Sequence, residues 1–246
     1  MVTGVNETGS PQTAPGGRSA QHAAEGQDTR TRLLNAAETL FAERGTEAVS
    51  LREIGRAAGA RNVIAAQYWF NDRDGLIRAL LDRHRVEIEA RRHTLLDAYE
   101  SDGISGADAD PAARFHALAG ALARPFAVKL DQGESGSGYL RTLADLITRP
   151  DPAIETLGID GSDSSILRWR MLVEPLLEPE AVALHRRFHV IRFVAVELAQ
   201  RSRVPGRTDH RLFVSQLVDA AAGLLSARVS EETRRLSAAR RPKGEA

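Results

Sequence analysis

The sequence contains no cysteine, and this absence excludes several kinds of chemistry at once. Without thiols the chain cannot form disulfides, bind a metal through thiolates or use a cysteine nucleophile. No apolar run approaches the roughly 18 residues that span a bilayer. The first residues also lack the apolar segment of a secretory signal. We therefore expect a cytoplasmic chain with no membrane partner.

The chain also lacks an excess of charge of either sign, because 33 Lys and Arg residues balance 33 Asp and Glu residues. A protein that coats nucleic acid with its whole surface would be strongly basic, so this class is excluded. A small DNA-reading unit joined to a neutral body remains compatible with zero net charge. With 246 residues and 42% hydrophobic content, the chain is large enough for one or two globular domains.

Motifs for catalysis or cofactor binding are scarce. His185 and His189 have a spacing that can chelate a metal on a helix, but no Glu completes a zinc-protease motif and no third ligand is near. Residues 133–138 are rich in glycine and serine, yet they lack the Lys-Ser/Thr ending of a phosphate-binding loop, so we interpret them as a flexible connection. We expect no metal, no cofactor and no enzymatic activity.

The apolar pattern predicts an all-α fold. Large apolar residues recur at helical spacing, and caps, glycines or prolines separate the segments. Residues 190–196 would suit a buried strand by composition, but no partner strand is visible elsewhere in the sequence. Helices are expected over residues 28–45, 50–59, 62–70, 72–99, 111–130, 138–148, 162–177, 179–202 and 209–229.

Composition divides the chain into four parts. Residues 1–27 are rich in glycine and proline with almost no large apolar side chains, so they are expected to form a disordered tail. Residues 28–75 form the candidate DNA-binding domain, and residues 76–232 form a helical domain for ligand binding and dimerisation. The polar residues 233–246 are expected to form a C-terminal tail.

The region from Leu33 to Leu81 has the layout of a helix-turn-helix. Ser50 followed by Glu53 forms a capping box at the start of its second helix. The small residues 57–60 lie where the two short helices must cross closely. Between Arg30 and Arg78 basic residues exceed acidic ones by two, because eight arginines face six acidic residues.

Several segments of this region resemble the tetracycline-repressor (TetR) family in order and spacing: Ala36-Ala37, Leu40–Gly45, Ser50–Ile54, Ala57–Gly59 and Tyr68–Leu76. The resemblance covers residues 29–85 and implies an N-terminal three-helix helix-turn-helix DNA-binding domain followed by a helical regulatory and dimerisation domain. The recognition helix departs from the family pattern: it has one additional residue, and Gln67 replaces a common aromatic residue. These departures leave open which face of that helix meets the bases.

The resemblance and the chemistry of base readout together give eight candidate DNA contacts. Asn and Gln side chains can pair with adenine, and Arg can pair with guanine. Tyr68 and Trp69 are each expected either to contact DNA or to pack in the core. Ser50 and Arg52 resemble phosphate-contacting positions, Arg73 matches a basic residue that holds the DNA backbone, and Arg30 or Arg32 is expected to do the same. The candidates are Ser50, Arg52, Arg61, Asn62, Gln67, Tyr68, Trp69 and Arg73.

Two segments near the C-terminus, residues 179–199 and 211–225, carry apolar residues on more than one side. This pattern predicts a second burial surface and hence a homodimer formed through a four-helix bundle. The expected interface residues are Phe188, Ile191, Val194, Leu198, Phe213, Leu217 and Leu224. Family analogy places an inducer site among the middle helices, although each candidate also fits an ordinary core. These candidates are Phe115, His116, Phe126, Tyr139, Leu143, Trp169 and Leu172.

The functional hypothesis is a transcriptional repressor that binds a palindromic operator as a homodimer and is released by a small-molecule inducer. The alternative is a helical ligand-binding or scaffolding dimer that does not bind operator DNA. A steep loss of DNA binding with salt would favour the repressor, whereas negligible binding would favour the scaffold.

Overall fold

The computed structural model describes residues 16–60, 64–106, 108–151, 164–204, 206 and 209–240, and all regular secondary structure in these ranges is helical. The prediction of an all-α fold is confirmed. In chain order the elements are α1 (Gly16–Arg44), α2 (Leu51–Ala57), α3 (Ala65–Phe70), α4 (Arg73–Ser101), α5 (Pro111–Ala127), η1 (Val128–Asp131), α6 (Gly133–Ile147), α8 (Ser165–Val173), η2 (Glu174–Leu176), α9 (Pro179–Ala183), α10 (Arg186–Arg201), α11 (Arg211–Ser226) and α12 (Glu231–Arg240).

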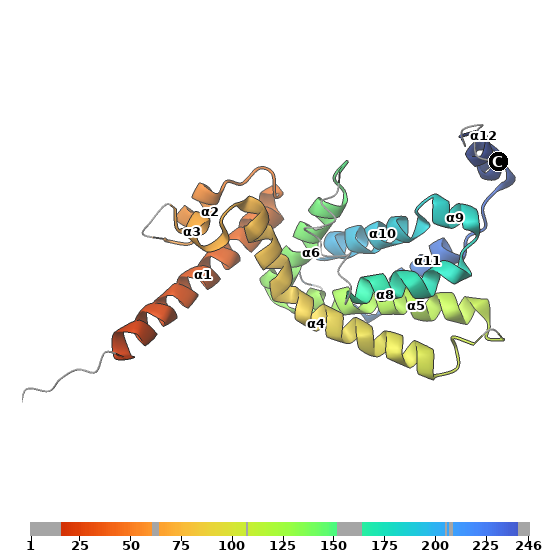
Figure 1. Ribbon diagram of the computed structural model, residues 1–246, viewed down its shortest axis with the longest axis horizontal. Helices are drawn as coiled ribbons and strands as arrows, with labels where there is room; N and C mark the ends of the chain where they lie inside the picture. Colours follow the sequence, from red (N-terminus) through yellow and green to blue (C-terminus); the bar gives the residue numbers. More distant parts are fainter. Residues whose placement is uncertain are drawn as a thin grey trace, which may run out of the picture.

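The molecule is elongated and has two parts (Figure 1). The head consists of α1, α2, α3 and the first two turns of α4, and the body consists of the remaining helices. Helix α4 runs from the head into the body, where it packs against α5, α6 and α8. The head also touches the body through α1, which packs along α6.

Local signals define the ends of the head helices. Gly45 has a φ of 79°, the left-handed conformation that ends α1 and favours glycine. Asp72 caps α4 by accepting a hydrogen bond of 2.7 Å from the backbone N–H of Gly75. A Cβ atom at position 75 would lie only 2.0 Å from the carbonyl oxygen of Phe70, so this turn requires glycine.

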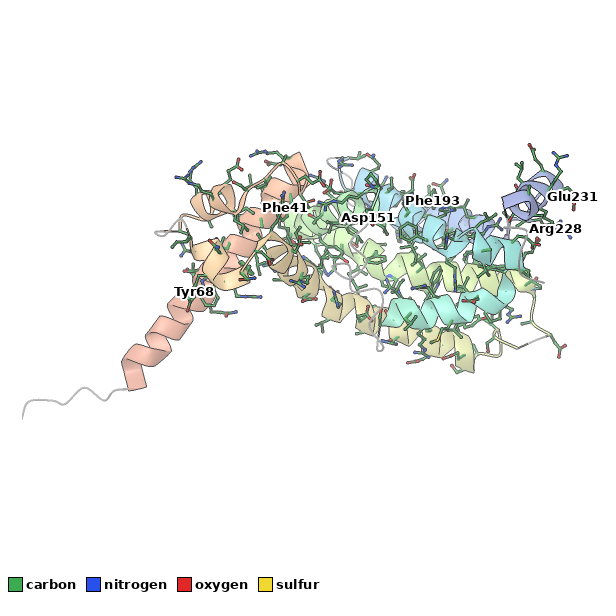
Figure 2. All side chains as sticks on the ribbon, turned by 45° about the horizontal axis from the view of Figure 1, so that its top comes forward. Phe41, Tyr68, Asp151, Phe193, Arg228 and Glu231 are labelled. Atoms are coloured by element: carbon green, nitrogen blue, oxygen red, sulfur yellow. The ribbon has the colours of Figure 1, made fainter. Side chains whose placement is uncertain are left out.

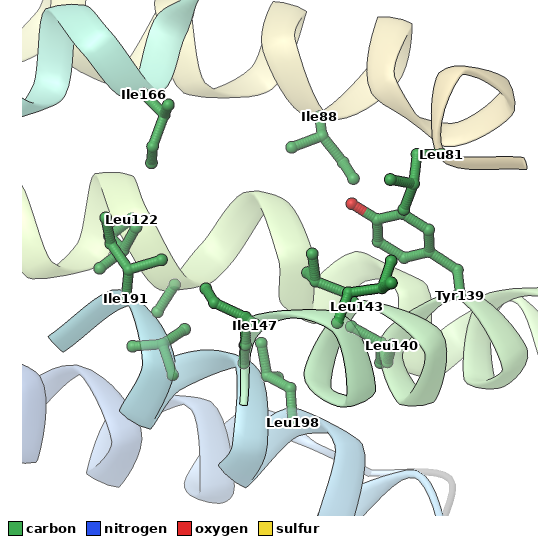
Figure 3. Close-up of a cluster of buried hydrophobic side chains, with 14 of the residues drawn as sticks. Leu81, Ile88, Leu122, Tyr139, Leu140, Leu143, Ile147, Ile166, Ile191 and Leu198 are labelled. Carbon is green, nitrogen blue, oxygen red and sulfur yellow. The ribbon is translucent and has the colours of Figure 1, made fainter. Parts of the chain in front are cut away.

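One hydrophobic core runs through the head and the body. In the head, Leu33, Phe41 and Ile54 are fully or almost fully buried. In the body, α4, α6, α8 and α10 converge on a cluster of Leu, Ile and Tyr side chains (Figure 3). At about 25 cal/mol per Å² of apolar surface, burial of this kind is the main stabilising contribution to the fold.

Helix α6 differs from the sequence prediction. Residues 133–138 were expected to be a loop, but they form the first turns of α6. The glycines there permit close packing: a Cβ atom at Gly138 would lie 2.8 Å from Cγ of Glu38 in α1, and one at Gly136 would lie 2.0 Å from the carbonyl oxygen of Lys129. Composition alone indicated a flexible connection, whereas tertiary packing between α1 and α6 uses these glycines within a helix.

The N-terminal region also differs. Residues 1–27 were expected to be disordered, but α1 begins at Gly16, and residues 1–15 lie outside the described part. Good helix formers such as Ala20 and Ala23 extend a helix that is already nucleated by its buried turns. The N-terminal part of α1 projects beyond α2 and α3 (Figure 1).

The C-terminal region differs in two further places. The helix expected over residues 179–202 is divided into α9 and α10 at His185, which has a φ of 56°. Neither glycine nor proline signals that break. The expected polar tail from residue 233 contains most of α12, although residues 241–246 lie outside the described part.

None of the described helices is long and apolar enough to cross a bilayer by itself. One pair, Arg211–Ser226 and Glu231–Ala239, reaches that length and composition only when its two parts are taken together across a bend of 57°.

Candidate functional site

The start of α2 is fixed by the predicted capping box. The backbone N–H of Ser50 donates to Glu53 Oε2 at 2.9 Å, and the Glu53 N–H donates to Ser50 Oγ at 3.3 Å. Arg44 adds an ion pair of 3.0 Å to the same carboxylate. Hydrogen bonds from the Ser50 backbone and side chain, followed by the Arg44 interactions, lower the pKa of Glu53 from its usual 4.5 to about 2. The cap therefore holds an ionised carboxylate at neutral pH.

Helix α3 has one buried face and one exposed face. Ala66 and Phe70 are buried and anchor the helix to the head. Gln67 is exposed, and the Tyr68 side chain is 82% exposed (Figure 2). Trp69 is half-buried and packs against the core, with its ring 5.5 Å from that of Tyr68 in an edge-to-face arrangement. The two aromatic residues therefore separate into an outward Tyr68 and an inward-leaning Trp69.

Basic residues surround α3. Arg52 is exposed on α2, while the predicted contacts Arg61 and Asn62 lie outside the described residues. Arg73 is half-buried at the first position of α4, and its Nε and Nη2 atoms are buried without a hydrogen-bond partner among the described residues. A guanidinium with free N–H groups is suited to an oxygen anion from outside the chain.

Arg30 and Arg32 of α1 have partners within the head. Arg30 lies over the Phe70 ring, with 5.4 Å between its guanidinium carbon and the ring centroid. Arg32 forms an ion pair of 3.1 Å with Asp28 and donates to the Ala58 carbonyl oxygen at 3.4 Å. Arg30 and Arg32 therefore connect α1 to α3 and to the end of α2.

A buried polar cluster joins the head to the body, and sequence analysis did not identify it. Glu38 of α1 is 3% exposed and lies 2.6 Å from His84 Nε2 of α4. Ser135 of α6 donates to Glu38 Oε2 at 2.8 Å, and Arg83 lies 3.4 Å from the same oxygen. The carboxylate therefore has partners on both body helices that touch α1, so its burial is compensated.

A second polar contact lies close to the first. The backbone N–H of Thr46, just after α1, donates to Asp145 Oδ2 of α6 at 3.0 Å. Arg149 contacts both the Thr46 hydroxyl and the Asp145 carboxylate. The end of α1 is thus tied to the end of α6.

The body contains a small cavity of about 60 Å³ between α4, α6, α8 and α10. Of the predicted ligand-contacting residues, Phe126, Tyr139 and Leu143 line it. Phe115, His116, Trp169 and Leu172 lie elsewhere: His116 borders a different hollow, and Trp169 is a core residue whose indole donates to the Leu118 carbonyl oxygen at 2.7 Å. Figure 3 shows Tyr139 extending from α6 towards Leu81 and Ile88 of α4, which also line the cavity.

Arg92 lies in the cavity wall and is 1% exposed. Its Nη1 donates to Ser165 Oγ at 2.8 Å, and its guanidinium lies over the Phe126 ring at 4.7 Å. Burial lowers the pKa of Arg92 to about 10, although the nearby Glu89 charge opposes this shift. Burial likewise raises the pKa of the Tyr139 hydroxyl above its usual range, which keeps that group neutral. Sequence analysis missed Arg92 because an arginine on a long polar helix is indistinguishable from a surface charge.

The predicted dimer residues divide into two groups. Ile191, Val194, Leu198 and Leu217 are buried within their own chain, so they belong to the intramolecular core rather than to a free surface. Phe188 and Phe213 are half-buried, and Leu224 is 41% exposed. Helical periodicity did not reveal which apolar stripe faces α5 and α6.

The histidine pair also differs from its expected arrangement. His185 lies at the junction between α9 and α10, whereas His189 lies within α10. The two side chains therefore do not share one regular helix face.

Comparison with known proteins identifies the head. Residues 33–80 match the sequence model described as bacterial regulatory proteins, tetR family. No curated protein matches the chain. Among solved structures, the chain is similar to a mutant of the HlyIIR protein with 16% identity and a TM-score of 0.49, over 82% of this chain and 97% of that one.

Proposed function

Because residues 33–80 match the tetR family of bacterial regulatory proteins, we propose that the chain is a transcriptional repressor released by a small-molecule inducer. In this proposal it binds a palindromic operator as a homodimer. The observation that carries the proposal is the exposed face of α3. Gln67 and Tyr68 lie on this face, while Ala66 and Phe70 are buried and anchor the helix to the head.

Helix α3 has the chemistry expected for reading bases. The Gln67 amide can donate to and accept from adenine in the major groove, and the Tyr68 ring can contact a thymine methyl or a phosphate. Tyr68 is 82% exposed, so its ring and hydroxyl are accessible to a partner. The predicted contacts Arg61 and Asn62 lie outside the described residues and remain part of the proposal as base-reading side chains.

Phosphate contacts in this proposal come from the flanks of α3. Arg73 is half-buried at the first position of α4, and Arg52 is exposed on α2. Ser50 also borders this surface, although its hydroxyl and N–H both contact Glu53. We therefore assign the stronger backbone contacts to Arg73 and Arg52, since cations contribute the salt-dependent part of DNA affinity.

A homodimer in this proposal forms through the outer faces of α10 and α11. These faces carry Leu224 and the half-buried Phe188 and Phe213, while the buried residues behind them keep the two helices in place. Two recognition helices held by one dimer would read two half-sites, which greatly increases discrimination between DNA sequences.

Release by an inducer in this proposal uses the cavity of the body. Helix α4 lines the cavity with Leu81 and Ile88 and also begins the head-facing segment at Arg73. A ligand that fits better when α4 is displaced would shift the population towards a state in which the two recognition helices no longer match their half-sites.

The test begins with fragments selected by the full-length protein from a random DNA pool. Affinity for a selected fragment should fall steeply with salt concentration. Arg73→Ala should weaken binding to all DNA and lower the salt slope by about one, whereas Gln67→Ala should change base preference at one position by about 1–3 kcal/mol. Arg91→Ala, an exposed change on the body part of α4, should leave both properties unchanged.

Weak binding that does not depend on salt would contradict the proposal and favour a scaffolding dimer. Unchanged operator affinity in both head variants would show that α3 does not enter the groove. A monomer at every concentration tested by analytical ultracentrifugation would contradict the dimeric arrangement.

A further inference from the structure

The guanidinium of Arg92 has one edge without a partner. Its Nη1 contacts Ser165 Oγ, whereas Nε and Nη2 are buried and make no hydrogen bond to any described residue. These two nitrogens lie on the same edge of the planar group and form the fork that fits a carboxylate in a bidentate manner. A buried donor without an acceptor is costly, so a fold retains one only where something offsets the cost.

The residues around the cavity do not neutralise Arg92 fully. Glu89 Oε1 lies 3.8 Å from Arg92 Nη1, while Glu89 Oε2 accepts a hydrogen bond of 2.6 Å from the Ser165 backbone N–H. Arg85 also lines the cavity and pairs with Asp82 at 3.1 Å. Asp82 thus pairs with Arg85, whereas Glu89 lies beyond hydrogen-bond distance of Arg92, so the unpaired edge of Arg92 is the cationic feature of the cavity.

The rest of the lining is apolar and aromatic. Carbon-rich side chains come from α4, α6, α8 and α10, and several of them appear in Figure 3. They include Ile88, Leu143, Ile147, Ile166 and Ile191. A site with one cationic edge and an apolar wall selects a ligand with a single anionic group and a hydrocarbon body.

We propose that this cavity binds a small amphipathic monocarboxylate, whose two oxygens pair with Nε and Nη2 of Arg92 while its hydrocarbon part packs on Ile88, Leu143 and Ile191. As the identity of the inducer, this inference rests on the proposed function, but the binding itself does not require DNA. The volume of about 60 Å³ is below the roughly 300–1,000 Å³ of drug-sized sites, so the ligand is small and must widen the cavity as it enters.

The experiment uses the full-length protein and four probes: hexanoate, benzoate, and their neutral amides hexanamide and benzamide. Thermal unfolding and calorimetric titration are measured for each probe. At least one carboxylate should bind and raise Tm by about 5–10 °C at 100 times its Kd. The matching amide should give no shift, because it cannot supply two anionic acceptors to the fork. Equal shifts with acid and amide, or no shift with either acid, would overturn the proposal.

Variants of Arg92 separate pairing from simple filling of space. Arg92→Met should abolish carboxylate binding without lowering the Tm of the ligand-free protein, so loss of binding cannot be attributed to misfolding. Arg92→Lys should retain attraction but lose the fork, weakening binding about tenfold. The matched control Arg91→Met, one residue along the helix and half-exposed, should bind as the original chain does. Undiminished carboxylate binding by Arg92→Met would also overturn the proposal.

The outcomes distinguish this inference from the proposed function. Carboxylate binding that leaves operator affinity unchanged would support the ligand class and contradict induction. Operator binding without any carboxylate binding would support the DNA-binding role and overturn the ligand class.

Discussion

Two of the buried charged side chains, Glu38 and Arg92, differ in how their charge is compensated. At the junction of head and body, Glu38 has partners from α4 and α6, including His84 and Ser135. At the cavity, the equally buried Arg92 has one hydrogen bond and two free nitrogens. The first place fixes the arrangement of three helices, whereas the second leaves binding capacity unused. The junction is therefore a structural contact, whereas the unpaired edge of Arg92 is the feature on which the proposed ligand site rests.

The largest expected effect tests the junction. Glu38→Ala removes the acceptor shared by His84 and Ser135 and leaves buried donors without partners. We expect a loss of about 3 kcal/mol in the free energy of unfolding, measured by urea denaturation. Glu43→Ala, an exposed change on the same helix, should cost less than about 0.5 kcal/mol. Similar losses in the two variants would remove the distinction between the two places.

A matched pair of substitutions tests the cavity. Arg92→Met replaces a poorly compensated cation with an apolar side chain of similar size and should raise the free energy of unfolding by about 1–4 kcal/mol. Lys129→Met should lower it by about 1–3 kcal/mol, because the buried Lys129 ammonium is paired at 2.7 Å with Glu87 and at 3.0 Å with Gln132. Urea denaturation of both variants gives the comparison. If Arg92→Met lowers the free energy of unfolding as Lys129→Met does, Arg92 is a structural residue.

The close packing of the junction gives a third test. Gly138→Ala places a Cβ atom 2.8 Å from Glu38 Cγ, so α1 and α6 must separate. We expect a loss of about 1–3 kcal/mol in stability by urea denaturation, despite the better helix propensity of alanine. Ser137→Ala, on the same turn, should have a much smaller effect. A stabilising Gly138→Ala would show that the junction is looser than its contacts indicate.

The smallest effect concerns pH and is confined to the head. The pKa of Glu53 is lowered in the folded chain, so its contribution to stability is present above pH 4.5 and is lost as the pH falls towards 2. Glu53→Gln should therefore reduce the acid dependence of unfolding in that window, measured by urea denaturation between pH 2 and 6. At pH 7 the variant should also have a weaker N-terminal cap on α2. An unchanged pH profile would assign the acid dependence to other carboxylates.

The head was predictable because its signals are local. Ser50 and Glu53, three residues apart, predict a capping box, and Gly45 predicts the end of a helix. The all-α class follows from the helical spacing of the apolar residues. In α6, by contrast, glycines that indicated a loop lie in a helix because α1 packs against them.

The charged groups of the interior were not predictable in the same way. Glu38 and Ser135 are separated by 97 residues, and Arg92 and Ser165 by 73. Without knowledge of which helices meet, each of these residues resembles an ordinary surface side chain. Long-range packing also determined that Ile191 and Val194 belong to the core and not to a free face.

The uninterrupted length of α4 has a geometric consequence. Its 29 residues measure about 43 Å at 1.5 Å per residue. If it pivots about its midpoint by about 5°, its two tips move about 2 Å in opposite directions, which exceeds the tolerance of a hydrogen bond. A displacement of about 2 Å at the C-terminal end of α4 would therefore move its N-terminal end, next to α3, by a similar distance in the opposite direction.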